Sequence, residues 1–417
     1  MAKYSFLKEV KKSLVPDKTF IKEVEVFIKE LNKILKGENI VAECVKGGSV
    51  AKGTLIKDDH DVDLFVRFEY DKYKDQKISN ILEKSLKKFK PERVHGSRDY
   101  FQIKKNKMTY ELVPVLKIDD YSRAENVTDM SPLHVDWVKK HTTKSKLDEI
   151  RLLKQFCKAN ELYGAESYIG GFSGHIIDII TIHYGSFLNV LEEVRNWGAK
   201  ETIDPEQHLL DPFNDLNSSK VMSPLIIVDP VQPDRNAAAA LSKEKFELFK
   251  IKANEFLESP SQDYFIKKQF KIADVKKQKK EDETLFIVEA EALEGKTDVI
   301  GAKLLKTHNH ITRELKDNDF KVEDYGWNFD KEKKAVFYYF VKSKKLSDEI
   351  EQRGPPVDSV VDSAKFKNKH ETITIRNGRM YAKVKRKYTT PNKLIEDLIK
   401  SEYVKERTKK VKKEMVK

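Results

Sequence analysis

The sequence predicts an α+β protein of several domains, and three observations lead to this fold class. The chain has 417 residues, too many for one ordinary hydrophobic core, so we expect two to four domains. Apolar residues recur at helical spacing in some stretches and alternate with polar residues in others. Helices and strands are interleaved near both ends of the chain, whereas residues 142–256 read as mostly helical.

The first third predicts a mixed sheet with helices. From Phe20 onward, apolar residues recur every three or four positions, Asp17 can cap the start of this helix, and Gly37 can end it. Further elements follow in this order: strand 40–45, strand 61–68, helix 78–89 and a hairpin over 99–118. We therefore place a first domain at residues 1–140.

The middle of the chain predicts a helical domain at residues 141–256. Its most apolar segment, residues 170–188, contains Asp178 and two histidines, so it predicts a buried helix rather than a membrane span.

The remainder predicts a C-terminal body and tail at residues 257–417. Residues 285–342 read as strand, helix, strand and strand, which makes a sheet with a helix on one face, a shape often used to hold RNA. Asn377-Gly378 predicts a two-residue hairpin turn, because this dipeptide tolerates positive φ. Residues 405–417 predict a basic helix or frayed tail.

The net charge indicates the class of partner, and the cysteines and the N-terminus indicate the cellular compartment. The formal net charge is +12, which favours a polyanionic partner such as a nucleic acid. Only two cysteines are present, Cys44 and Cys157, too few for a disulfide framework or a zinc site, so both read as small core residues in a reducing compartment. The N-terminus lacks the apolar run of a signal peptide, so we expect a cytoplasmic protein with no membrane partner.

Two aspartates at the start of strand 61–68 are candidate metal ligands. Residues two apart in a strand project to the same face, roughly 6–7 Å apart, so Asp61 and Asp63 point the same way. Paired carboxylates suit a hard divalent ion such as Mg²⁺. The alternative is a charged surface turn, and a calcium loop is disfavoured because Leu64 stands where that loop requires glycine.

The residues before and after this strand add to the candidate site. Gly47 and Gly48 let a phosphate approach the backbone, and Ser49 and Lys52 add a hydroxyl and a cation, although Gly-Gly is also a common tight turn. A metal pair needs a third anionic ligand from an adjacent strand, and the predicted hairpin offers Glu111. On its own, Glu111 reads as an ordinary solvent-facing strand glutamate.

These motifs resemble a known family. "GGSVAKGT" followed by "DVDLFV" is similar to the nucleotidyltransferase superfamily typified by DNA polymerase β. Later blocks, in preserved order over essentially the whole chain, resemble the archaeal (class I) CCA-adding enzymes, which are tRNA nucleotidyltransferases. These blocks are "SPLHVDWV", "RLLKQFCKANELYGAE", "GGFSGHIIDIITIHYGSF", "IVDPVQPDRNAAAALS", "ESPSQDYF", "RGPP" and "KRKYTTP".

The resemblance implies a polymerase β-like catalytic head, a helical neck, and α/β body and tail domains that grip the acceptor stem of tRNA. It implies template-independent addition of C, C and A to the tRNA 3′ end from CTP and ATP, with Mg²⁺ and release of pyrophosphate. One Mg²⁺ would lie between the three carboxylates and a second on the aspartate pair. The implied catalytic and metal residues are Asp61, Asp63 and Glu111. The implied ATP- and CTP-binding residues are Ser49, Lys52, His134, Lys154, Tyr163 and Arg235.

Two residues depart from the family pattern, and the ligand residues have structural alternatives. The family carries aspartate where this chain has Glu111, and its triphosphate position can be arginine where this chain has Lys52, which loses the bidentate fork. Lys154 could be a solvated surface lysine, and Arg235 could cap a helix beginning near residue 236. His134 and Tyr163 could cap or pack.

Two rival functions stay open. The first is another terminal transferase, of the poly(A) or oligoadenylate polymerase type, and the second is a non-catalytic RNA-binding relative. The sequence also leaves the oligomeric state open, with a homodimer among the expected partners.

Overall fold

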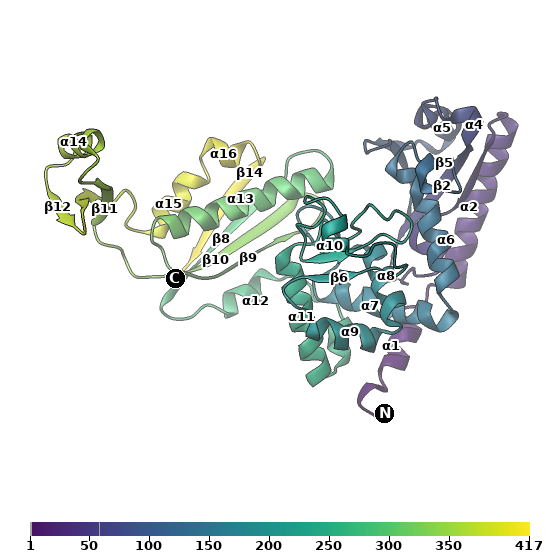
Figure 1. Ribbon diagram of the computed structural model, residues 1–417, viewed down its shortest axis with the longest axis horizontal. Coiled ribbons are helices and arrows are strands. Elements are labelled where there is room, and N and C mark those ends of the chain that lie inside the picture. Colours follow the sequence, from purple (N-terminus) through teal and green to yellow (C-terminus); the bar gives the residue numbers. More distant parts are fainter. Residues whose placement is uncertain (1, 58) are drawn as a thin grey trace. The chain divides into compact units, whose positions relative to one another are not determined.

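The computed structural model describes residues 2–57 and 59–417 (Figure 1). By their contacts the residues divide into two compact units, 1–268 and 269–417, which we call the N-terminal and C-terminal units. Their longer helices are α1 (Leu7–Ser13), α2 (Lys18–Gly37), α5 (Ile78–Leu86), α6 (Ser131–His141), α7 (Lys144–Ala159), α8 (Gly174–Tyr184), α9 (Phe187–Asn196), α11 (Lys243–Glu258), α13 (Thr297–Asp317), α14 (Val360–Lys369) and α15 (Pro391–Leu398). Shorter helices are α3 (Gly48–Lys52), α4 (Tyr70–Tyr73), α10 (Pro212–Asp215), α12 (Ile272–Lys277) and α16 (Glu402–Lys405).

A five-stranded mixed sheet forms the first part of the N-terminal unit, as the sequence predicts. Its strands are β1 (Ala42–Lys46), β2 (Asp61–Glu69), β3 (Glu92–Val94), β4 (Tyr100–Lys105) and β5 (Met108–Lys117). They lie in the order β1-β2-β5-β4-β3, in which β2 and β5 are parallel and the other neighbours are antiparallel. The predicted hairpin is confirmed: Asn106 and Lys107 turn between β4 and β5, both with positive φ.

Helix α2 buries an apolar stripe against this sheet. Val24, Phe27, Leu31 and Leu35 recur at helical spacing and are almost fully buried in the core of the sheet domain. Asp17 occupies the predicted N-cap position, but its side chain accepts no capping hydrogen bond within the described residues. The stripe of apolar residues therefore determines the helix more than its cap does.

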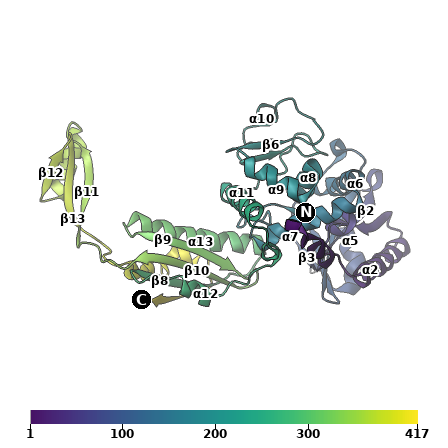
Figure 2. The ribbon, with the colours of Figure 1, turned by 90° about the horizontal axis from the view of Figure 1, so that it is seen from below.

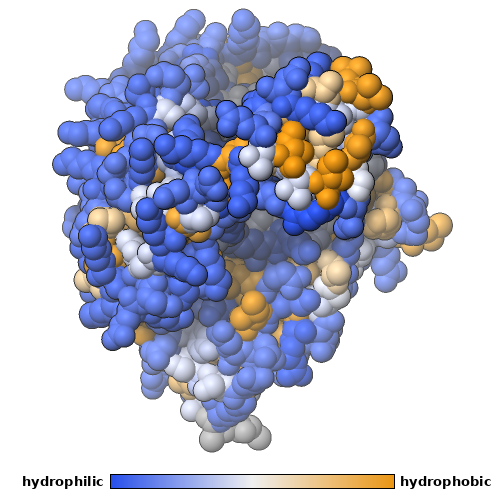
Figure 3. Space-filling view, turned by 90° about the vertical axis from the view of Figure 1, so that its left-hand side faces the viewer, coloured by the Kyte–Doolittle hydropathy of each residue, from blue (hydrophilic) through white to orange (hydrophobic). Residues whose placement is uncertain are grey.

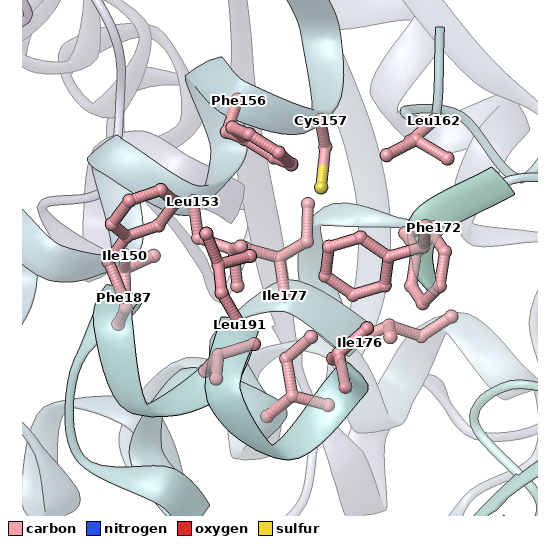
Figure 4. Packing of buried hydrophobic residues seen from close by; sticks show 14 of the residues in the cluster. Ile150, Leu153, Phe156, Cys157, Leu162, Phe172, Ile176, Ile177, Phe187 and Leu191 are labelled. Atoms are coloured by element: carbon pink, nitrogen blue, oxygen red, sulfur yellow. The ribbon is translucent and has the colours of Figure 1, made fainter. Parts of the chain in front are cut away.

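The helical core of the N-terminal unit is built by α7, α8, α9 and α11, joined by α1. Figure 4 shows the part of this core where α7, α8 and α9 meet. Cys157 of α7 points toward Ile177 of α8, with Phe172 beside them. Helix α8 is buried on nearly every side, which explains why its sequence is apolar almost throughout. Both cysteines are free and buried, so their prediction as core residues is confirmed.

A short parallel pair interrupts this helical region. The strands β6 (Glu201–Ile203) and β7 (Leu225–Ile227) have three residues each. The expectation of a mostly helical middle missed them because three residues are too few to show an alternating pattern.

The C-terminal unit contains the predicted strand–helix–strand–strand order. The strands β8 (Glu283–Glu291), β9 (Val322–Phe329), β10 (Lys334–Lys342) and β14 (Lys410–Val416) form an antiparallel sheet in the order β14-β8-β10-β9. Helices α13 and α15 pack on one face of this sheet, and α12 packs through Val275 on the other. Figure 2 shows α13 and α12 on opposite sides of the sheet.

Strand β14 corrects the prediction of a helical or frayed basic tail. It pairs in antiparallel register with β8, from Lys410 opposite Glu291 to Val416 opposite Leu285. Its lysines obscured an alternation in which Val411 and Lys413 are half-buried while Lys410 and Lys412 face solvent. Pairing with β8 supplies backbone hydrogen bonds that local sequence preference does not reveal.

A second, three-stranded sheet carries α14. The strands β11 (Glu349–Pro356), β12 (Ile373–Arg376) and β13 (Arg379–Lys385) lie in the order β11-β13-β12. Asn377 and Gly378 make the predicted turn, both with positive φ. Figure 3 faces this part of the chain and shows apolar side chains gathered in one region, and the exposed apolar residues here include Val357, Val360, Val361 and Ile375.

Among the described residues, no helix combines the length and the apolar character needed to cross a bilayer.

Candidate functional site

Three carboxylates lie on the two parallel strands of the first sheet. The register places Asp63 of β2 directly beside Glu111 of β5, and Asp61 lies two residues earlier on the same face as Asp63. Gln102, opposite Glu111 on β4, donates a hydrogen bond of 2.6 Å from Nε2 to Glu111 Oε1. The structure therefore places the three acids that the sequence analysis singled out on one face of neighbouring strands, with their carboxylate oxygens not all within 4.8 Å of one another.

The glycine turn packs directly on Asp63. Gly47 donates its backbone N–H to the carbonyl oxygen of Asp63 at 2.8 Å. Gly48 has a φ of +45°, and a Cβ at this position would lie 2.7 Å from Asp63 Cγ. Only glycine fits this conformation and this close approach. The turn leads into α3, whose first and last turns carry Ser49 and Lys52.

The electrostatics of this face favour a cation. Burial and the neighbouring charge of Asp61 raise the pKa of Asp63, although Lys154 and Lys52 oppose the shift. Burial, followed by the charges of Glu111 and Asp63, also raises the pKa of Tyr100. Carboxylate oxygens on one face of neighbouring strands match the ligand preference of hard divalent ions. Asp61, Asp63 and Glu111 are thus the residues that could hold such an ion.

Lys52 is paired with a buried acid of the helical core. Its Nζ lies 2.8 Å from Asp178 Oδ2 on α8, and both side chains are at most one-tenth exposed. This ion pair joins the glycine turn to α8.

Two lysines and one carboxylate lie beside the ring of Tyr163. Lys154 Nζ lies 2.9 Å from Asp59 Oδ2, and Lys158, one turn along α7, contacts the other oxygen of the same carboxylate. The ammonium groups of Lys154 and Lys158 lie 5.6 and 5.1 Å from the centre of the Tyr163 ring. Lys154 is only 5% exposed, so its alternative reading as a solvated surface lysine is wrong.

Lys154, Lys158 and Asp59 together carry two positive charges and one negative charge. Burial works to lower the pKa of Lys154, but Tyr163 and Asp59 raise it above its usual value. Burial, and then the charge of Lys154, lower the pKa of Lys158. Burial opposes ionisation of Asp59, yet the two lysines hold its pKa below the usual value. One carboxylate shared by two ammonium groups leaves a local demand for an anion.

His134 and Arg235 meet at a different carboxylate, Asp229. His134 Nε2 lies 2.9 Å from Asp229 Oδ1, and Arg235 Nη1 donates to Asp229 Oδ2 at 2.7 Å. The alternative in which Arg235 caps a helix near residue 236 is not met, because the next helix, α11, begins at Lys243 with Ser242 as its N-cap.

The predicted residues thus form two neighbouring groups linked by α8. The first contains the carboxylates, Ser49, Lys52, Lys154 and Tyr163, and the second contains His134 and Arg235. Helix α8 presents Asp178 to the first group and His175 to the second, three residues apart on one helical face.

Sequence reasoning missed the partners of its candidates. Asp59, Lys158, Asp178, His175 and Asp229 all contact predicted residues. For Lys158 a signal existed, since it follows Lys154 by four positions on an amphipathic helix. The other four depend on contacts between segments distant in sequence.

Models of three protein families match the chain in succession. A nucleotidyltransferase domain matches residues 28–138, the second domain of tRNA nucleotidyltransferase matches residues 148–266, and the C-terminal domain of CCA-adding enzymes matches residues 281–417. The mixed sheet and the first of these matches define a nucleotidyltransferase with a polymerase β-like catalytic domain, and this class implies the use of a divalent metal ion.

Curated relatives identify the family within that class. The CCA-adding enzyme of Nanoarchaeum equitans is 38% identical over 349 residues, which cover 82% of this chain and 84% of the relative. Those of Pyrococcus abyssi and Sulfolobus acidocaldarius are 34% and 29% identical, covering 78% and 91% of this chain and 75% and 88% of the relatives. The chain belongs to the family of CCA-adding enzymes, which confirms the resemblance seen in its motifs.

Solved structures agree at the level of the fold. A cytoplasmic RNA terminal U-transferase is 14% identical with a TM-score of 0.51, covering 64% of this chain and 99% of that structure. The Cid1 poly(U) polymerase with 3′-dATP bound is 13% identical with a TM-score of 0.51, covering 63% and 98%.

Proposed function

We propose that this protein adds C, C and A to the 3′ end of tRNA, from CTP and ATP and without a nucleic-acid template. The observation that carries the proposal is the register of β2 and β5, which sets Asp63 beside Glu111 and against the glycine turn. The three successive family matches over residues 28–417 support tRNA as the acceptor.

In the proposed reaction, the oxygen of the tRNA 3′-hydroxyl attacks the α-phosphorus of CTP or ATP in line, and pyrophosphate leaves. Asp61, Asp63 and Glu111 would hold Mg²⁺, and Glu111 is the candidate acceptor of the hydroxyl proton. Bound Mg²⁺ would supply positive charge that lowers the pKa of the 3′-hydroxyl and neutralises the triphosphate.

Basic side chains of the first group would position the phosphates. Lys52, Lys154 and Ser49 are the proposed contacts, and we add Lys158, because it shares Asp59 and the face of Tyr163 with Lys154. Positioning and charge stabilisation supply most of the catalysis in transfers of this kind.

The second group would contact the rest of the nucleotide. His134 is a proposed nucleotide contact, and Arg235 is the candidate for reading the base edge.

The C-terminal unit would bind the acceptor stem mainly through phosphate and shape contacts, and binding should weaken as salt concentration rises. The division into a head, neck, and body with tail at residues 1–140, 141–256 and 257–417, a cytoplasmic location and a homodimer stay predictions.

Separate incubation of the purified protein and Mg²⁺ with each nucleoside triphosphate tests the proposal. With tRNA that lacks its terminal CCA, CTP alone should add two nucleotides, and ATP should add one only after both. An open-ended A tail would favour the rival poly(A)-type transferase, and tRNA binding without pyrophosphate release would favour the non-catalytic relative.

A substitution of Asp63 tests the metal assignment. Asp63→Asn should abolish addition and leave tRNA affinity within about twofold of the unchanged protein, because this carboxylate would bind metal rather than RNA. Asp71→Asn, at a solvent-exposed aspartate just beyond β2, is the matched control and should add nucleotides normally. Unchanged turnover in Asp63→Asn would exclude this metal site.

A further inference from the structure

Asp229 is a fully buried carboxylate that collects several donors at once. Its Oδ1 accepts the backbone N–H groups of Val231 at 3.0 Å and Gln232 at 3.2 Å, together with His134 Nε2. Its Oδ2 accepts Arg235 Nη1 at 2.7 Å and lies 3.4 Å from His175 Nε2. The side chain of Asp229 is not exposed at all, whereas that of Arg235 is 43% exposed.

The backbone around Asp229 adds rigidity to this arrangement. The Asp229 N–H donates to the carbonyl oxygen of Arg235 at 3.0 Å, and the Arg235 N–H donates to that of Gln232 at 3.0 Å. Pro230 and Pro233 restrict the same loop. The loop therefore holds the Arg235 side chain at its end through both backbone and carboxylate.

His134, His175 and Asp229 have ligand atoms close enough to share a metal ion. The geometry favours a network of hydrogen bonds over a metal site at these residues. His134 Nε2 lies at hydrogen-bond distance from both carboxylate oxygens, and the positive guanidinium of Arg235 already occupies Oδ2. Burial, opposed by contact with Asp229, lowers the pKa of His175 to about 3, and its ring packs 4.3 Å from that of His134.

We propose that Asp229 is a positioning residue for nucleotide selection, holding Arg235 and His134 in the orientation that admits C and A and rejects U and G. This inference rests on the proposed function. Arginine only donates hydrogen bonds. Cytosine N3 and adenine N1 accept hydrogen bonds, whereas uracil N3 and guanine N1 at the same edge of the base carry a hydrogen. A hydrogen-bond donor held at this edge would therefore bind C and A and would reject U and G. Arg235 donates one N–H to Asp229, and the exposed part of its guanidinium keeps further N–H groups for the base.

Selectivity for CTP over UTP in Asp229→Asn tests the inference. The isosteric change keeps the size of the side chain but removes the charge that holds Arg235 and His134. We expect kcat/KM for CTP and ATP to fall by about 10- to 100-fold, as for loss of a charge-assisted hydrogen bond. The ratio of kcat/KM for CTP to that for UTP should fall by at least 10-fold. An unchanged ratio would overturn the inference.

Asp129→Asn is the matched control. Asp129 is equally buried and is bound by Arg98 and by the backbone N–H of Leu116 at 2.7 Å, outside both residue groups of the site. It should lower the unfolding temperature without changing the CTP-to-UTP ratio. An equal loss of selectivity in Asp129→Asn would mean that general destabilisation is the cause, and would overturn the inference.

Two further measurements cover the remaining outcomes. Arg235→Lys keeps a positive charge beside Asp229 but removes the planar guanidinium, so it should lower the ratio of kcat/KM for CTP to that for UTP. This variant serves as the test if Asp229→Asn does not fold, and an unchanged ratio overturns the inference. A stoichiometric transition metal that resists chelation in the unchanged protein and is lost in His175→Gln would also overturn it. If the unchanged protein adds no C or A to tRNA, the proposed function itself fails, whatever the variants do.

Discussion

Replacing Gly48 by alanine should disable the carboxylate site while leaving the fold intact. A Cβ at this position would lie 2.7 Å from Asp63 Cγ and 2.9 Å from Asp63 Cβ. Carbon atoms in contact are ordinarily about 3.5–4.0 Å apart, so the carboxylate carbon must move by about 1 Å. A misplacement of this size at a reacting centre can lower the rate by about 10²-fold.

The cost in stability has two sources. At a φ of +45°, a residue with a Cβ costs about 1–2 kcal/mol relative to glycine, and displacement of Asp63 by the added methyl group costs about 1–3 kcal/mol more. For a unit of this size, each kcal/mol lowers Tm by about 2–4 °C. Gly48→Ala should therefore remain folded at the assay temperature.

The assay is single-turnover addition of one labelled C to tRNA without its terminal CCA, at saturating CTP and Mg²⁺, together with Tm and tRNA affinity. Gly37→Ala, where a Cβ would meet no atom within 4 Å, should match the unchanged protein. Gly378→Ala, where φ is +70° but no atom is near, isolates backbone strain and should lower Tm alone. A rate for Gly48→Ala within threefold of the unchanged protein would refute the reasoning.

Three further predictions concern phosphate binding, pH and salt. Lys158→Ala should raise KM for CTP and ATP by about 10-fold, since a charged contact is lost, whereas Lys144→Ala, at the exposed start of α7, should leave steady-state kinetics unchanged. Burial lowers the pKa of His308 to about 4, so neutral His308 stabilises the fold above pH 6.5, and this contribution disappears as pH falls toward 4. Between pH 7 and 5 the free energy of unfolding should drop by about 2 kcal/mol more in the unchanged protein than in His308→Gln, as measured by denaturant titration; equal drops would contradict this. Finally, log Kd for tRNA should rise linearly with log salt in a filter-binding assay, and a flat response would exclude phosphate contacts as the main source of affinity.

The sequence predicted what depends on local periodicity. The alternation in "DVDLFV" puts Asp61 and Asp63 on one face of a strand, and the hairpin signal puts Glu111 on a neighbouring one. The helical stripe of α2 and the turn at Asn377 follow equally from local pattern and backbone preference.

Long-range partners could not be predicted in the same way. The pairing of Lys52 with Asp178 joins residues 126 positions apart, and that of His134 with Asp229 spans 95. Strand β14 was misread because strand preference depends on what a segment packs against, and its partner β8 lies more than 100 residues away.

The ion pairs of Lys52 and Lys154 have a consequence for affinity. Because each ammonium already has an internal acid, an arriving polyphosphate would exchange one anionic neighbour for another. For Lys52, the energetic gain would be the attraction to the triphosphate minus the attraction to Asp178; for Lys154 the loss would be smaller, because Asp59 is shared with Lys158. In the proposed reaction, Asp178 and Asp59 would weaken retention of the triphosphate, and they would pair with the lysines again once pyrophosphate leaves.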